Sequence, residues 1–224
     1  MMNTPIPAVV FDLDGTLVDS AADVQRALNR TLASEELRPL EVDLVRYMIG
    51  GGPRLLVLRA LAELRVKKSR YVVDKLTDLF HDEYLRQENT ESRLYDGAED
   101  CLRQLRASGT RIGICSNKPD DLCHKLINDL GVAQYFDVIL GSGSGLARKP
   151  DPAPLLEVIQ RLNSRPEAAL YIGDSETDVK TARAAGVDVV LVSYGYTARP
   201  ASDLGADKVY DSLADIVLPA SRAV

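Results

Sequence analysis

Short β-branched runs alternate with amphipathic helical segments through the second half of the chain. The helical segments have apolar residues three and four positions apart, and three of them stop at a glycine: Gly109, Gly131 and Gly186. The order of strand, helix, glycine and strand is typical of a parallel sheet covered by helices on both faces. The sequence therefore predicts an α/β fold with a doubly wound, Rossmann-like core, whose strands are Ala8–Asp12, Arg111–Ser116, Asp137–Gly141, Ala168–Gly173 and Asp188–Ser193.

The stretch from about Ser20 to Leu94 departs from this alternation, because it contains amphipathic helical runs and no convincing strand. We therefore predict a core of residues 1–18 and 95–224, with an all-helical cap of residues 19–94 inserted after the first strand. The segment Asn89–Asp96 is the predicted return hinge from the cap to the core.

Composition narrows the classes of function. The chain has 224 residues, and 33 acidic against 27 basic side chains give it a formal charge of −6. This balance argues against nucleic acid or an anionic membrane as the main partner, and no run reaches the roughly 18 apolar residues of a membrane span. The first apolar run meets Asp12 at once, unlike a signal peptide, and three cysteines are too few for a disulfide framework. We expect a cytoplasmic protein.

The first predicted strand ends in two aspartates, Asp12 and Asp14, followed by Gly15 and Thr16. Residues i and i+2 leave a strand on the same side, and ligands of open parallel sheets bind at the carboxyl ends of the strands. Both carboxylates can therefore face one crevice. The alternative is that Asp14 or Thr16 caps the next helix while Asp12 is a solvated strand end.

Two further candidate positions follow later in the chain. The Ser116 hydroxyl and the N–H of Asn117 stand at the start of a predicted helix, with Pro119 near its first position, and this arrangement suits phosphate binding. An ordinary helix N-cap is the alternative. Lys149 precedes a proline in a stiff loop, although a surface lysine is the commoner explanation for a single such residue.

Asp174 and Asp178 follow another apolar run and share a face if a helix has begun there, or they are acidic residues favoured by a helix N-terminus. With Asp12 and Asp14 they would bring four negative charges to one crevice, against Lys149 as the local cation. All-oxygen ligands of this kind suit a hard divalent ion such as Mg²⁺ rather than zinc. The combination predicts phosphoryl transfer with an aspartate as covalent nucleophile.

In this order the four motifs resemble those of the haloacid dehalogenase superfamily of phosphatases, and in particular its phosphoglycolate phosphatase-like branch. The motifs are Asp12–Thr16, Ser116-Asn117, Lys149-Pro150 and Gly173–Asp178. The resemblance covers essentially the whole chain, including a helical cap after the first motif. Each motif by itself is weak, but the four in order are highly specific.

The resemblance implies a role for each matched residue. Asp12 would attack phosphorus and form an aspartyl-phosphate. Asp14 would protonate the leaving alkoxide and then deprotonate the water that hydrolyses the intermediate. Ser116 and the N–H of Asn117 would hold phosphoryl oxygens, and Lys149 would neutralise Asp12 and the transferring group.

The resemblance also implies a Mg²⁺ site. Its ligands would be the Asp12 carboxylate, the backbone carbonyl of Asp14 and the Asp174 carboxylate. Asp178 would orient the waters of the metal or Lys149 instead of binding the metal itself.

Other chemistries stay open as alternatives. Dehalogenases lack the second aspartate of the first motif, so Asp14 argues against that activity, and Gly173 before Asp174 favours a hydrolase over a phosphomutase. A phospho-accepting receiver-like module uses similar groups but needs no large insertion. The predicted substrate is a small phosphorylated metabolite, first of all 2-phosphoglycolate, with a sugar phosphate, a nucleotide or pyrophosphate as alternatives.

The glycine-rich segment Ile49–Arg54 is the most unusual feature of the predicted cap. Its glycines let backbone approach a ligand or let a loop hinge, or they form a plain turn. Arg54 is the candidate for specificity, because a planar guanidinium can pair with a substrate carboxylate. The alternative is that Arg54 lies in solvent or pairs with an acidic residue of its own helix. The sequence leaves the oligomeric state open.

Overall fold

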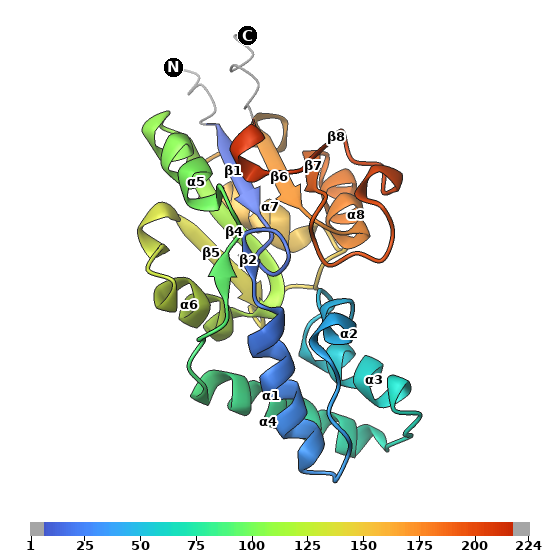
Figure 1. Ribbon diagram of the computed structural model, residues 1–224. Coiled ribbons are helices and arrows are strands. Elements are labelled where there is room, and N and C mark those ends of the chain that lie inside the picture. Colours follow the sequence, from blue (N-terminus) through green and yellow to red (C-terminus); the bar gives the residue numbers. More distant parts are fainter. Residues whose placement is uncertain (1–6, 217–224) are drawn as a thin grey trace.

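A six-stranded parallel sheet lies at the centre of the computed structural model, which describes residues 7–216 (Figure 1). The strand order is β5-β4-β1-β6-β7-β8, so β4 and β5 lie on one side of β1 and the later strands β6, β7 and β8 lie on the other. This doubly wound arrangement confirms the predicted fold class. The strands are β1 Ala8–Phe11, β4 Arg111–Pro119, β5 Val138–Ser142, β6 Ala169–Gly173, β7 Asp188–Val192 and β8 Lys208–Tyr210.

Helices cover both faces of the sheet, and the central strand β1 shows why. Val9 and Phe11 belong to the apolar cluster that includes α5 and α6, whereas Ala8 and Val10 belong to the cluster that includes α7 and α8. Successive side chains of a strand point to opposite faces, so a strand covered on both faces is apolar throughout. These helices are α5 Ala98–Ala107, α6 Asp120–Asp129, α7 Ala153–Arg161 and α8 Glu176–Ala185.

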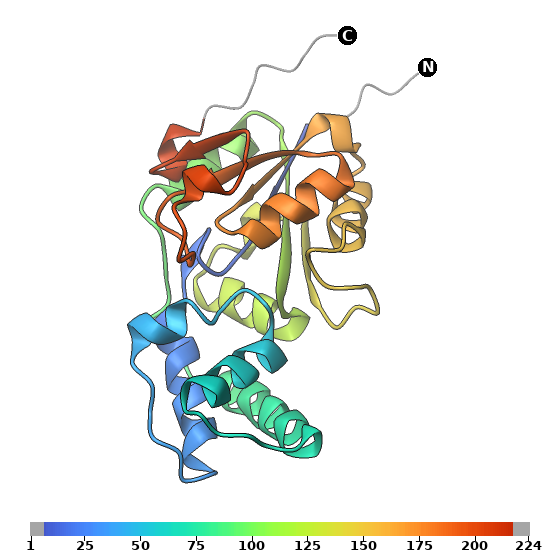
Figure 2. The same ribbon diagram turned by 90° about the vertical axis from the view of Figure 1, so that its right-hand side faces the viewer.

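Four further helices, α1 to α4, lie beyond the carboxyl end of β1 (Figures 1 and 2). They share a separate apolar cluster, which also takes in Leu122 of α6. The predicted cap, residues 19–94, contains all four, and a small antiparallel pair of strands with Val18 opposite Leu94 stands where the chain leaves and re-enters the core. These elements are β2 Val18–Asp19, α1 Ala21–Ala33, α2 Val42–Arg46, α3 Pro53–Glu63, α4 Arg70–Arg86 and β3 Arg93–Leu94.

The sequence pattern does not predict β2, β3 or β8. Strands of two or three residues are too short to show a period-2 pattern, and only pairing with a neighbour makes them strands. The predicted return hinge Asn89–Asp96 contains β3. Four single 3₁₀ turns complete the described chain: Ala133–Tyr135, Pro166–Ala168, Ala201–Asp203 and Leu213–Asp215. No helix in residues 7–216 is long and apolar enough to cross a membrane.

Candidate active site

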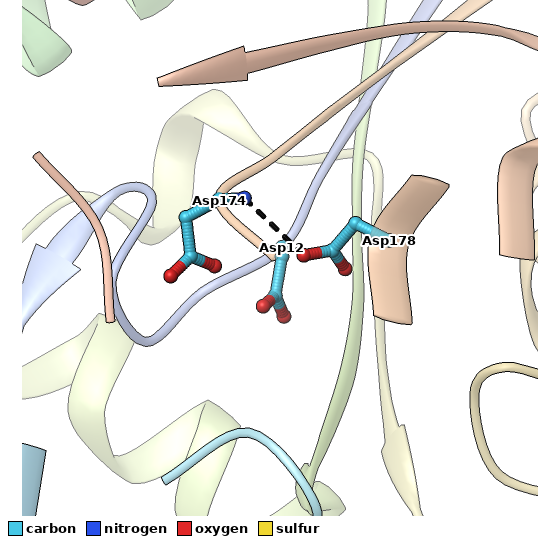
Figure 3. A group of neighbouring side chains, drawn as sticks. All are labelled: Asp12, Asp174 and Asp178. Atoms are coloured by element: carbon cyan, nitrogen blue, oxygen red, sulfur yellow. Dashed lines mark hydrogen bonds between the residues drawn. The ribbon is translucent and has the colours of Figure 1, made fainter. Parts of the chain in front are cut away.

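The carboxyl ends of β1 and β6 bring three aspartates together (Figure 3). Asp12 follows β1 and Asp174 follows β6, and the two strands are paired neighbours with Phe11 opposite Ile172. Asp178 comes from the first turn of α8. One carboxylate oxygen of each lies within 4.8 Å of the others, and all three residues are buried. These predicted residues meet because parallel neighbours end at the same edge of a sheet.

Asp178 is already bound by protein groups. Its Oδ2 accepts hydrogen bonds from the N–H groups of Asp174 (3.2 Å) and Ser175 (3.0 Å) and from the Ser175 hydroxyl (2.7 Å). Its Oδ1 accepts from Lys149 (2.8 Å) and from the Tyr171 hydroxyl (3.0 Å). Burial by itself raises the pKa of Asp178, but the Lys149 charge and these hydrogen bonds lower it below its ordinary value. Asp178 thus caps α8 and orients Lys149.

Lys149 stands between two carboxylates. Its Nζ lies 2.8 Å from Asp178 Oδ1, 2.9 Å from Asp12 Oδ1 and 2.8 Å from the Tyr171 hydroxyl. The contact with Asp12 is an ion pair that lacks hydrogen-bond alignment, so Asp12 Oδ1 is buried and accepts no hydrogen bond from the described residues. Burial lowers the pKa of Lys149, but the charges of Asp12 and Asp178 raise it above its ordinary value, and the ammonium stays charged.

Asp12 and Asp174 are less well compensated than Asp178. Burial raises the pKa of Asp12 to about 6, even though the Lys149 charge opposes the shift. Burial and the charges of Asp178 and Asp12 raise the pKa of Asp174 well above its ordinary value. A divalent cation would supply the missing positive charge, and carboxylate oxygens are the ligands that hard cations prefer. The residues present therefore fit a divalent metal ion.

Two glycines and a loop backbone hold Asp174 in place. The N–H of Tyr196 donates to its Oδ2 at 2.6 Å, and the Thr16 hydroxyl donates to its Oδ1 at 3.3 Å. A Cβ at Gly195 would collide with the side chain of Asp174, and one at Gly15, where φ is +87°, would lie 2.6 Å from its Oδ2. Glycine is required at both positions because the backbone approaches the carboxylate closely.

Asp14 is held by two side chains, Ser20 and Lys118, to which the sequence assigns no role. The Ser20 hydroxyl donates to Asp14 Oδ1 at 2.5 Å, and Lys118 Nζ lies 3.0 Å from Oδ1 and 3.3 Å from Oδ2. Lys118 is buried, and its Nζ lies 4.3 Å from the centroid of the Tyr84 ring. The position of Lys118 directly after Asn117 was the only sequence signal for it, and nothing in the sequence pointed to Tyr84.

Ser116 and Asn117 lie at the end of β4 and line the same cavity as Asp12. The Asn117 side-chain amide donates to the carbonyl of Gly50 at 3.0 Å and to the carbonyl of Lys149 at 3.1 Å. Asn117 therefore connects the glycine-rich segment of the helical unit to the Lys149 loop.

The cavity lies between the strand ends and the helices α1 to α4. Gly52 has a φ of +83°, and a Cβ there would lie 2.8 Å from Arg148 and 3.0 Å from the Asn117 carbonyl, which explains a glycine at this position. The glycine-rich segment thus packs on the core and covers the cavity. Besides the polar residues of the strand ends, the lining is mostly apolar and includes Val24, Ile49, Pro53, Leu56, Phe80 and Leu122.

Arg54 does not reach this cavity, which corrects its predicted role. Its Nε donates to Asp74 of α4 at 2.9 Å, and both side chains are exposed, by 43% and 47%. Arg54 follows Pro53 at the start of α3, and its neighbour Pro53 lines the cavity whereas Arg54 does not. The geometry leaves Arg54 a surface ion pair, close to the alternative that the sequence had left open.

Tyr196 is a further residue of the site that no sequence pattern indicates. Its hydroxyl accepts hydrogen bonds from the N–H groups of Ser20 (2.8 Å) and Ala21 (3.0 Å) and donates to Asp19 at 2.7 Å. Because its own N–H binds Asp174, one residue connects the aspartate cluster to the point where the chain enters α1. An isolated tyrosine in a loop carries no spacing signal that could have revealed this.

Comparison with known proteins agrees with this geometry. Residues 9–192 match the family described as haloacid dehalogenase-like hydrolase. The chain belongs to this family. As a haloacid dehalogenase-like hydrolase it is an enzyme, and the receiver-like alternative is set aside.

Individual relatives extend over nearly the whole chain. The phosphoglycolate phosphatase of Rhodospirillum rubrum is 41% identical over 213 residues, which cover 93% of this chain and 88% of that protein. The phosphoglycolate phosphatase of Caulobacter vibrioides is 38% identical over 208 residues, with 93% and 88% covered. A crystal structure of a predicted phosphoglycolate phosphatase from Haemophilus somnus aligns with a TM-score of 0.85 and 29% identity, over 95% of this chain and 97% of that one.

Proposed function

We propose that this haloacid dehalogenase-like hydrolase is a Mg²⁺-dependent phosphatase that forms an aspartyl-phosphate on Asp12 and acts on 2-phosphoglycolate, giving glycolate and phosphate. The observation that carries the proposal is the state of Asp12. Its carboxylate is buried beside the Lys149 ammonium at 2.9 Å, one oxygen accepts no hydrogen bond from the described residues, and the residue lines the cavity. The names of the relatives support the substrate.

The chemistry divides among residues that surround Asp12. The Asp12 carboxylate attacks phosphorus in line with the leaving alkoxide. The Ser116 hydroxyl and the backbone N–H of Asn117 bind phosphoryl oxygens, and the Lys149 ammonium compensates the charge of the transferring group. Asp14 donates a proton to the leaving alkoxide and then takes one from the water that hydrolyses the aspartyl-phosphate.

The Asp12 carboxylate, the Asp14 backbone carbonyl and the Asp174 carboxylate would hold the Mg²⁺. When bound, the ion compensates the negative charge that builds up on the phosphoryl oxygens. Asp178 supports the set indirectly, because its carboxylate is taken up by Lys149, Tyr171 and the start of α8.

A panel of phosphate esters tests this function. Purified protein with Mg²⁺ is given 2-phosphoglycolate, sugar phosphates, nucleotides and pyrophosphate, and released inorganic phosphate is measured. We expect the highest kcat/KM with 2-phosphoglycolate and a loss of activity in EDTA that added Mg²⁺ restores. No phosphate release from any ester, isomerisation of a sugar phosphate in place of hydrolysis, or activity that resists EDTA would contradict the proposal.

We also propose that the enzyme works in the cytoplasm. The acidic composition supports this location, as do the three cysteines Cys101, Cys115 and Cys123, which are all free and buried.

A further inference from the structure

Two side chains without a role in the proposed mechanism meet at one wall of the cavity. Lys118 comes from the end of β4 in the core, and Tyr84 comes from α4 in the helical unit. Both line the cavity, and the Lys118 Nζ lies 4.3 Å from the centroid of the Tyr84 ring. The pair therefore bridges the two parts of the molecule between which a substrate would bind.

Lys118 is a buried cation that its protein partners engage only in part. An ammonium carries three N–H donors, and Lys118 directs them at one carboxylate, that of Asp14, through distances of 3.0 and 3.3 Å. Its Nζ also lies over the Tyr84 ring, and the cavity that Lys118 lines has apolar side chains such as Leu122 in its wall. Among the described residues that line the cavity, Lys118 is the one cation, so it is the group that an anionic substituent in the cavity would meet.

The Tyr84 hydroxyl is a second, independent sign of a ligand. Tyr84 is fully buried, and its hydroxyl has no hydrogen-bond partner in the described part of the chain. A buried polar group without a partner is costly, so such a group at a cavity wall is a natural donor to a bound molecule. Burial raises the pKa of Tyr84 to about 12, which keeps the hydroxyl a neutral donor.

We propose that Lys118 and Tyr84 form the site for the carboxylate of the substrate, with one carboxylate oxygen on the Lys118 ammonium and the other on the Tyr84 hydroxyl. The inference rests on the proposed function and deepens it, because it names the groups that distinguish a short phosphorylated acid from other phosphate esters. The other residues that the helical unit contributes to the lining are apolar side chains, such as Leu56 and Phe80, and glycines, so within residues 7–216 this unit offers no further side-chain partner for the hydroxyl groups of a sugar.

The test separates recognition from turnover by using ligands that cannot be hydrolysed. Calorimetry with Mg²⁺ compares 3-phosphonopropionate, which keeps the carboxylate of 2-phosphoglycolate, with propylphosphonate, which lacks it. Wild-type protein should prefer the carboxylate ligand. Tyr84→Phe removes only a hydroxyl and should reduce its affinity for 3-phosphonopropionate about 10- to 100-fold, the usual effect of a hydrogen bond to a charged group, with propylphosphonate affinity unchanged.

Lys118→Met should abolish the preference for the carboxylate ligand altogether. Its hydrolysis of any ester should also fall, because Asp14 loses a partner, and for this reason binding is the deciding measurement. In turnover assays the Tyr84→Phe defect should appear with 2-phosphoglycolate and be absent with ethyl phosphate.

Tyr95→Phe is the matched control. The Tyr95 hydroxyl is also buried without a partner among the described residues, but Tyr95 packs on Tyr194 and does not line the cavity. The Tyr95→Phe variant should bind both phosphonates with the affinity of the wild type.

Two results would overturn the inference: equal weakening of both phosphonates by Tyr84→Phe, or no weakening of either. The proposed function fails separately, through absence of turnover in the wild type. The phosphonates report binding alone, so a Tyr84-dependent preference for 3-phosphonopropionate would support the carboxylate site even if the wild type hydrolysed no ester. Hydrolysis of 2-phosphoglycolate by a protein that lacks this preference would refute only the carboxylate site.

Discussion

The two walls of the cavity are built in opposite ways. At the strand ends, buried charges stand close together, with Lys149 between Asp12 and Asp178 and with Lys118 on Asp14. The wall from the helical unit consists of apolar side chains and glycine backbone, and among its described lining residues Tyr84 is the one with a polar side-chain group. Under the proposed function, this difference assigns the bond-breaking chemistry to the core and the selection of the substrate to the helical unit.

The largest effect on activity should come from the strand ends of the core, in the variant Asp12→Asn. The amide is nearly isosteric but is not a nucleophile, so kcat should fall by about 10⁴-fold or more. Phosphate release from 2-phosphoglycolate measures this, and far-ultraviolet circular dichroism checks that the fold is retained. In the wild type BeF₃⁻ should bind on the Asp12 carboxylate, and its appearance on another side chain would assign the chemistry elsewhere.

The next largest effect distinguishes the proposed role of Asp14 as proton donor from that of Asp12 as nucleophile. Asp14→Asn removes the proton donor, so hydrolysis of alkyl phosphates should fall about 10²- to 10⁴-fold. An aryl phosphate needs little protonation of its leaving group, so the rate of aspartyl-phosphate formation from it should be partly spared. Equal loss of that rate for both kinds of ester would mean that Asp14 only shapes the site.

The stability of the protein and its affinity for Mg²⁺ should both depend on pH, because Asp12 is a buried carboxylate at the strand ends. Burial raises the pKa of Asp12 from 3.8 to about 6, so the metal-free folded protein binds more protons than the unfolded chain in this window, and its free energy of unfolding falls as pH rises through it. A Mg²⁺ ion bound at the proposed site would compete with that proton. Its apparent affinity should therefore be on the order of tenfold weaker at pH 5 than at pH 7.5.

Thermal unfolding with and without Mg²⁺ at the two pH values measures this competition. Asp174→Asn is the control, because it should lose most of the stabilisation by Mg²⁺ at either pH. A Mg²⁺ shift of equal size at pH 5 and pH 7.5 would show that the ion binds away from Asp12.

The smallest effect concerns the helical unit and compares its surface residue Arg54 with its cavity residue Tyr84. Arg54→Ala breaks an exposed ion pair with Asp74, so it should change the free energy of unfolding by at most about 1 kcal/mol and leave kcat/KM for 2-phosphoglycolate within about twofold. Tyr84→Phe is the contrasting variant. A selective loss toward 2-phosphoglycolate in Arg54→Ala would restore the role that the sequence suggested and would show that a residue outside the cavity lining contributes to selectivity.

The acidic residues at the strand ends were largely predictable from the sequence. Asp12 and Asp174 end strands whose apolar pattern is clear, and parallel neighbours must end at a common edge, so spacing along the chain was enough to bring them together. Lys118 was visible only as a neighbour of Asn117, and its burial depends on Tyr84, which arrives from a different part of the chain. Tyr196 lies in a loop, where no periodicity marks a functional residue.

By itself the sequence determined the parallel doubly wound sheet, the place of the helical unit in the chain and the set of carboxylates at the strand ends, because each of these depends on local periodicity or on spacing along a strand. Only the tertiary structure decided which side chains of the helical unit face the cavity. That choice depends on how α3 and α4 rotate about their axes as they pack on one another and on Leu122 of α6, and long-range packing sets this rotation. It turned Arg54 to the surface and Tyr84 inward.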